Sequence, residues 1–220
     1  MKRLLAAVLG ALLFVAAPVM AFDPARLFRS VRAITDAAGD RFCSSSSINE
    51  TKHYWLTAAH CVWHGGYVNG EPIAVIMRDV VDDLAVFSTR SSHAPALGLS
   101  YTAPRVGDET MVVGFPYGNL DPLVTFGRVS QVNGRLCQES EEEQPYLCEP
   151  RRYLVTDATG APGSSGSPIL NKDGRMISIV TVGYGRTFGP NWGVPYQVLN
   201  SIVGHYFEKG SKNNGPENRQ

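Results

Sequence analysis

The sequence lacks net charge, because 20 lysine and arginine side chains balance 20 aspartates and glutamates among its 220 residues. Proteins that bind nucleic acid usually carry a basic surface, so this balance argues against nucleic acid as a partner. Cysteine is scarce as well, and none of the four cysteines stands in a CxxC or Cys/His spacing typical of zinc sites. We therefore expect neither a metal site nor a cofactor.

Long apolar runs are missing after the N-terminal segment. There, a basic pair precedes an apolar run from Leu4 to Val19, and small or short side chains occupy the last and third-last positions of residues 19–21. This combination predicts a signal peptide, residues 1–21, cleaved after Ala21. An uncleaved anchor is the alternative, but it needs an apolar run of ~20 residues. We expect a secreted or periplasmic protein without a stable membrane anchor after cleavage.

The remaining chain, about 199 residues, suits one all-β domain or two small packed barrels. Short strand candidates alternate with turns rich in glycine and proline, which favours an all-β fold. Val198, Ile202 and Tyr206 share one helical face and predict a C-terminal helix. The predicted boundaries are a domain over 22–207, a crossing between barrels near 93–105, and a disordered tail over 208–220.

Four cysteines behind a signal peptide indicate two disulfides, for which three pairings are possible. We favour Cys43 with Cys61 and Cys137 with Cys148, because each of these bonds would close a local loop.

One short loop, residues 161–168, carries the features that acyl transfer needs. Ser165 lies in a tight loop rich in glycine and bounded by prolines, so its hydroxyl and two neighbouring backbone N–H groups are free to act at one point. Such clusters are usually no more than turns. Upstream, however, stand His60 and Asp83, which complete the order His, Asp, Ser of a known catalytic triad.

Each of these residues has a role in that chemistry. His60 would take the proton from the Ser165 hydroxyl, and Asp83 would orient the imidazole and stabilise its charged form. The N–H groups of Gly163 and Ser165 would form the oxyanion hole. Other residues of the same types compete for these roles, and they are His53, His64, His93, His205, Asp82, Ser164 and Ser167.

The segments 57–61, 83–85 and 163–168 together resemble the signature motifs of chymotrypsin-like (trypsin-like) serine peptidases. The resemblance covers roughly residues 31–203 and is strongest to the compact bacterial secreted branch, which includes the glutamyl endopeptidases and the HtrA-type protease domains. It implies two six-stranded antiparallel β-barrels, followed by a C-terminal helix. The spacing around Ser165 selects it over the other serines, and Asp83 is favoured because it directly precedes the Leu84-Ala85 pair of the motif.

Three positions depart from the family pattern. Serines occupy 44–47, where the corresponding strand usually carries glycines. Ser164 replaces the acidic residue that receives the new N-terminus in the digestive enzymes, so we expect no activating cleavage beyond signal removal. Ser167 replaces a commoner glycine, as it does in the glutamyl endopeptidases. None of these changes removes a catalytic group.

The resemblance also places a substrate pocket. Thr159, six residues before Ser165, would lie at its base, and the walls would come from Thr181, Val182, Gly183 and Trp192. None of these carries a charge, so we expect cleavage after medium-sized uncharged residues. His205 or Arg186 reaching in from a loop would instead restore an acidic preference.

The sequence thus predicts a serine endopeptidase that hydrolyses peptide bonds through an acyl-enzyme and acts on protein or peptide substrates. Two alternatives remain open. One is a catalytically silent homologue that uses the scaffold for binding, and the other is an esterase with the same nucleophile.

Overall fold

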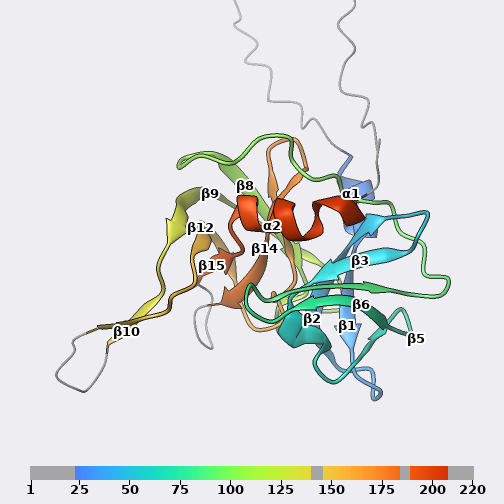
Figure 1. The fold of residues 1–220 in the computed structure, drawn as a ribbon. Coiled ribbons are helices and arrows are strands. Elements are labelled where there is room, and N and C mark those ends of the chain that lie inside the picture. The colour runs from blue at the N-terminus through green and yellow to red at the C-terminus, as the bar shows by residue number, and fades with distance from the viewer. Residues whose placement is uncertain (1–22, 140–145, 184–188, 208–220) are drawn as a thin grey trace, which may run out of the picture.

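In a computed structural model of the chain, residues 23–139, 146–183 and 189–207 are described here. They form two β-structures side by side, with the C-terminal helix α2 (Tyr196–Val203) lying across them (Figure 1). The predicted all-β fold with a C-terminal helix is thereby confirmed. The predicted signal peptide, residues 1–21, and the predicted tail, 208–220, lie outside the described residues.

The N-terminal half begins with helix α1 (Pro24–Ser30), whose first turn is capped by Asp23. It continues as one antiparallel sheet in the order β5-β4-β1-β2-β3-β7-β6. This sheet has seven strands rather than the predicted six, because β4 and β5 form a two-residue hairpin around Asn69 and Gly70, both with positive φ. The strands are β1 (Val31–Thr35), β2 (Arg41–Asn49), β3 (Tyr54–Thr57), β4 (Tyr67–Val68), β5 (Glu71–Pro72), β6 (Ala74–Asp79) and β7 (Leu84–Ser88).

The C-terminal half is a closed barrel of six strands in the order β12-β15-β14-β13-β8-β9, as predicted for this half. A separate hairpin, β10 (Cys137–Glu139) with β11 (Tyr146–Cys148), projects from it (Figure 1). The barrel strands are β8 (Glu109–Gly114), β9 (Leu123–Gly134), β12 (Tyr153–Gly160), β13 (Pro168–Asn171), β14 (Met176–Gly183) and β15 (Gly189–Gly193). Short 3-10 helices are η1 (Ala59–Val62), η2 (Pro116–Gly118) and η3 (Gly204–Tyr206).

One hydrophobic cluster joins the two halves and includes buried side chains from both sheets and from α2. Its members include Leu56, Leu84, Val113, Leu170, Ile179 and Leu199. Burial of apolar surface is the main favourable term in folding, so this shared core fixes the two barrels relative to one another. The segment between β7 and β8, where we predicted the crossing, is held at Leu97, whose N–H donates to the carbonyl of Ser47 at 2.8 Å.

Among the described residues, no helix has the length and apolar character needed to cross a membrane.

Candidate active site

His60 and Asp83 are brought together by two neighbouring strands. β3 pairs with β7, His60 follows β3 within η1, and Asp83 immediately precedes β7. The backbone N–H of His60 donates to Asp83 Oδ1 at 3.0 Å, and the His60 ring nitrogen Nδ1 lies 2.9 Å from Asp83 Oδ2. Both carboxylate oxygens are therefore engaged by one residue, which fixes the position of the imidazole ring.

This pairing sets the chemistry of the ring. An ionised carboxylate can only accept hydrogen bonds, so beside it a neutral imidazole has its proton on Nδ1 and a lone pair on Nε2. The side chain of Asp83 is 12% exposed, whereas that of His60 is 47% exposed. The imidazole is thus oriented from its buried side and reaches solvent on the other, which is the arrangement that a general base needs.

The other candidates for these two roles lie elsewhere. Among the described residues, His60 is the only histidine paired with a carboxylate. Asp82 donates its N–H to Asp79 and does not contact His60, and burial together with the Asp79 charge raises the pKa of its carboxyl group.

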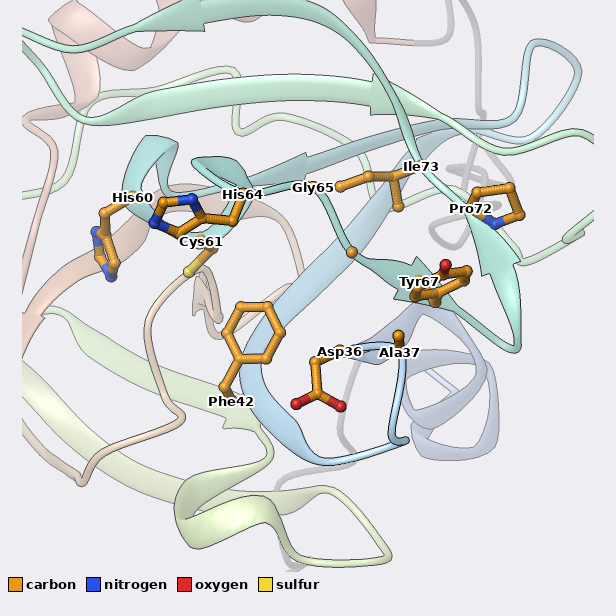
Figure 2. A pocket seen from close by; sticks show the side chains of 11 residues that line it. Asp36, Ala37, Phe42, His60, Cys61, His64, Gly65, Tyr67, Pro72 and Ile73 are labelled. Atoms are coloured by element: carbon orange, nitrogen blue, oxygen red, sulfur yellow. The ribbon is translucent and has the colours of Figure 1, made fainter.

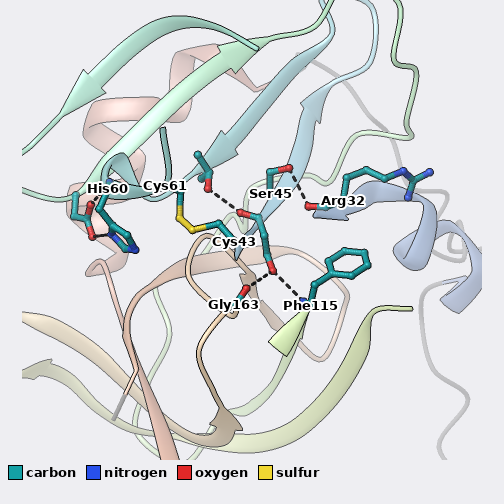
Figure 3. The surroundings of a disulfide bond; sticks show 10 residues. Arg32, Cys43, Ser45, His60, Cys61, Phe115 and Gly163 are labelled. Carbon is teal, nitrogen blue, oxygen red and sulfur yellow. Dashed lines mark hydrogen bonds and ion pairs between the residues drawn. A yellow bond between two sulfur atoms is a disulfide. The ribbon is translucent and has the colours of Figure 1, made fainter. Parts of the chain in front are cut away.

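The Cys43–Cys61 disulfide predicted from the sequence is present, with a Cα–Cα distance of 5.9 Å. It ties β2 to the residue directly after His60 (Figure 3). Both thiols are consumed by this bond, so the cluster of Cys43, His60 and Cys61 cannot hold a metal ion through them. Cys137 is also disulfide-bonded, and its backbone pairs with that of Cys148.

The serine loop packs directly on the strand end that leads to His60. Gly166 has φ +81°, and a Cβ there would lie 2.1 Å from the carbonyl oxygen of Ser44 and 3.2 Å from the N of Ala58. Only glycine allows both the positive φ and this close approach. The loop and the His60 segment are consequently in contact although a hundred residues separate them in sequence.

Backbone hydrogen bonds account for nearly every polar group of this loop. The carbonyl of Pro162 accepts from Tyr117 N–H, and that of Ser164 accepts from Ser167 N–H. The N–H of Ser164 donates to Ala161, and that of Gly166 donates to Val180. Among the described residues, the N–H groups of Gly163 and Ser165 have no acceptor.

The directions of these two N–H groups follow from peptide geometry. In a trans peptide the N–H points opposite to the preceding carbonyl. Because the Pro162 and Ser164 carbonyls are held on the protein side, the N–H groups of Gly163 and Ser165 point away from it. Two free backbone donors beside a serine hydroxyl are the elements of an oxyanion hole.

The hydroxyl of Ser165 makes no hydrogen bond to His60 in the part of the chain described. In ligand-free sites this bond is often long and shortens only when substrate binds. Ser164 and Ser167, the other serines of the loop, are buried, and Ser164 Oγ accepts from Ala161 N–H at 3.1 Å.

A cavity of about 550 Å³ opens beside His60 (Figure 2). Phe42, the Cys61 end of the disulfide, His64 and Tyr67 line it, and Asp36 lies at the turn that borders it. The N–H groups of Ala38 and Asp40 both donate to Asp36 Oδ1, so this turn is rigidly closed.

The residues predicted to line the substrate pocket lie on paired strands of the second barrel. Thr159 is exposed on β12, and its carbonyl accepts from Thr125. Thr181 and Val182 lie on β14, whose residues Val182 and Gly183 pair with Trp192 and Asn191 of β15. Trp192 packs edge-on against Tyr153 at 5.7 Å, in an interior cluster with Leu136 and Val155. Arg186 lies outside the described residues.

Sequence reasoning missed Asn191. It is fully buried, its Nδ2 donates to the carbonyl of Ala158 at 2.8 Å, and its Oδ1 has no hydrogen-bond partner. A Cβ on Gly160 would lie 1.9 Å from this Oδ1, so Asn191 fills the space that glycine leaves next to Thr159. A single asparagine next to an aromatic residue gave no signal of this in the sequence.

A seven-stranded sheet with a His–Asp pair, packed against a closed six-stranded barrel with a serine loop, is the arrangement of the chymotrypsin-like class of protein. In agreement, the family model for the trypsin-like peptidase domain matches residues 42–179. The chain therefore belongs to the trypsin-like peptidase family.

Known proteins point to the HtrA type within this family. A probable periplasmic serine endoprotease, DegP-like, from Chlamydia pneumoniae is 31% identical over 160 residues, which are 71% of this chain and 30% of that protein. The chain thus spans about a third of the length of this relative. The crystal structure of the serine endoprotease from Yersinia pestis has a TM-score of 0.62 at 21% identity, over 82% of this chain and 64% of that one. The active form of a protease from M. tuberculosis has a TM-score of 0.63 at 18% identity, over 82% of both chains.

Proposed function

We propose that this protein is a secreted or periplasmic serine endopeptidase that hydrolyses peptide bonds through an acyl-enzyme on Ser165. Its family membership supports the activity, and the curated relatives include proteins named as periplasmic serine endoproteases. The observation that carries the proposal is the hydrogen bonding of the serine loop, in which only the N–H groups of Gly163 and Ser165 have no acceptor among the described residues.

In the first half of the reaction, Ser165 Oγ attacks the carbonyl carbon of the scissile bond while His60 Nε2 takes the hydroxyl proton. The carbonyl oxygen becomes an oxyanion and receives the N–H groups of Gly163 and Ser165. Asp83 stabilises the imidazolium through the 2.9 Å contact with Nδ1. His60 then gives its proton to the leaving amine, and the C–N bond breaks.

In the second half, water takes the place of the amine. His60 removes a proton from it, the resulting hydroxide attacks the acyl-enzyme, and the proton passes to Ser165 Oγ as the acid leaves. Since His60 protonates the leaving amine, the departing peptide must lie on the His60 side. The cavity lined by Phe42 and Tyr67 is therefore the proposed site for residues that follow the scissile bond.

For the residue before the scissile bond, the proposed pocket consists of Thr159, Thr181, Val182, Gly183 and Trp192. Since Asn191 lies against Gly160, this region carries polar but uncharged side chains. A buried cation or anion without a counter-charge is costly, so cleavage should follow medium-sized uncharged residues. A peptide-library profile dominated by Arg/Lys or by Glu would contradict this preference.

A fluorophosphonate probe tests the proposed reaction, with casein and a short-chain ester as substrates. The wild-type protein beginning at Phe22 should be labelled and should cleave casein, whereas Ser165→Ala should do neither. Labelling without casein cleavage but with ester turnover would indicate an esterase. A folded wild-type protein that resists the probe would indicate a catalytically silent homologue.

A further inference from the structure

We propose that Ser44 is a positioning residue that holds the oxyanion loop in its active geometry, which rests on the function proposed above. Ser44 lies on β2 directly after Cys43 and is fully buried. It contacts neither the substrate position nor the His60–Asp83 pair, so its effect on catalysis would pass through the loop around Ser165.

Ser44 holds two carbonyl groups of the serine loop. The backbone N–H of Ser44 donates to the carbonyl of Ser165 at 2.8 Å, and its Oγ donates to the carbonyl of Gly163 at 2.8 Å. These carbonyls belong to the two residues whose N–H groups are free. Through these carbonyl groups, Ser44 therefore holds both residues whose N–H groups would form the oxyanion hole.

The Ser44 hydroxyl acts both as a donor and as an acceptor. It donates to the carbonyl of Gly163 and accepts from the N–H of Phe115 at 3.0 Å (Figure 3). Phe115 directly follows β8. Replacing this hydroxyl by an apolar group removes both hydrogen bonds. The partly buried Gly163 carbonyl on the loop and the buried Phe115 N–H would then lose this partner.

Ser44 is also linked to the strand that leads to His60. The carbonyl of Ser44 accepts from the Thr57 hydroxyl at 2.7 Å, and Thr57 ends β3, the strand that leads to His60. The disulfide from Cys43 to Cys61 runs beside this link. Ser44 thus connects the part of the fold that places the base with the part that places the nucleophile and the oxyanion donors.

β2 also provides a matched control. Ser45 is equally buried, but its Oγ donates at 3.1 Å to the carbonyl of Arg32 on β1, because successive side chains of a strand point to opposite faces. Ser45→Ala and Ser44→Ala remove the same atom from adjacent buried positions, and each leaves one partly buried carbonyl without its donor. They differ in that Ser44→Ala frees a carbonyl of the oxyanion loop and also leaves the Phe115 N–H without its acceptor.

The experiment measures both variants against wild-type protein and Ser165→Ala. Ser44→Ala should lower kcat for a fluorogenic peptide, and the rate of fluorophosphonate labelling, by about 10- to 100-fold, since small misplacements of a reacting group have effects of this size. KM for the peptide should change by less than about threefold, because ground-state binding does not use the oxyanion hole. Ser45→Ala should also lower the melting temperature, but it should leave both rates near those of wild type.

The proposal is overturned if Ser44→Ala is labelled at the wild-type rate, or if Ser45→Ala loses as much activity as Ser44→Ala. If Ser44→Ala does not fold, Thr57→Val removes the hydrogen bond on the other side of Ser44, and Thr57→Ser restores it. Thr57→Val should lower the rate of fluorophosphonate labelling, whereas Thr57→Ser should not. Equal labelling rates for these two variants would contradict the proposal. A wild-type protein inert to the probe overturns the proposed function itself, which separates that failure from a failure of the Ser44 assignment alone.

Discussion

The N-terminal sheet and the C-terminal barrel hold their parts of the site by different means. On the N-terminal side, a disulfide and the carboxylate of Asp83 fix the position of His60. On the C-terminal side, the serine loop is held by backbone hydrogen bonds and by glycines that allow close approach. The position of His60 thus depends on specific side chains, whereas the positions of the Gly163 and Ser165 N–H groups depend on the backbone path. We therefore expect substitutions in the two halves to affect activity and stability differently.

The largest expected effect is that of Asp83→Asn on catalysis. The amide cannot accept from Nδ1–H and from the His60 backbone as the carboxylate does, so the imidazole loses its tautomer and its charge partner. We expect kcat to fall by about 10⁴-fold with little change in folding. Steady-state kinetics and circular dichroism would measure both, with Asp82→Asn as the control. Equal losses in the two variants would mean that the acid of the site is misassigned.

The backbone side is tested by Gly166→Ala. A Cβ there meets Ser44 O at 2.1 Å and Thr57 Oγ1 at 2.2 Å, at a φ of +81°. Strain and overpacking together should lower the free energy of unfolding by roughly 2–6 kcal/mol and displace Ser165. Gly107→Ala is the matched control, because its φ is +91° but no atom lies within 4 Å of the added Cβ. Urea unfolding of both variants distinguishes the effect of steric overlap from that of backbone strain. Equal losses of unfolding free energy in the two variants would argue against the close packing of the loop.

The disulfides give an intermediate effect. Replacing Cys43 and Cys61 together by alanine should cost about 3 kcal/mol of unfolding free energy and should also lower activity, because this bond adjoins His60. Replacing Cys137 and Cys148 should lower stability but leave kcat unchanged. Thermal unfolding and labelling rates distinguish the two pairs. Peptide mapping without reduction that joins Cys61 to Cys148 would contradict the pairing.

The smallest effect should come from Asp82→Asn on stability. Burial and the charge of Asp79 raise the pKa of this carboxyl group in the folded state. The folded protein therefore holds this proton more tightly than the unfolded chain, and the contribution of Asp82 to stability falls as the pH rises through its folded pKa. Asparagine does not ionise and so removes that loss. The free energy of unfolding of the variant, relative to wild type, should therefore rise between acidic and neutral pH, by less than about 1 kcal/mol. Urea unfolding at both pH values would show the gain, and a variant less stable at neutral pH would contradict it.

The N-terminal sheet and the C-terminal barrel also differ in how much of their structure could be predicted from the sequence. The all-β fold and the Cys43–Cys61 bond were predictable because they follow from local patterns and from motif order. The placement of His60 beside Asp83 agrees with the predicted pair, and its catalytic role stays a prediction. The seventh strand was missed because β4 and β5 together contain only four residues, too few for a visible alternation.

The supporting residues could not be predicted, because their roles depend on contacts between distant segments. Ser44 reads as one of four consecutive serines until the fold places it against Gly163, 119 residues away. Asn191 likewise gains its place only from the register of β15 against β12. In both cases the missing information is which face of a strand meets which loop, and a single sequence does not contain that.

The backbone at Asp83 has a consequence for how such a protein could change in evolution. Its φ of +58° is tolerated well by glycine, asparagine and aspartate, and poorly by most other residues. Exchange of Asp83 for asparagine would therefore keep the backbone conformation and would disable the proposed general base. A single exchange of this kind would give a protein that binds peptides without cleaving them and keeps its cleft and its fold.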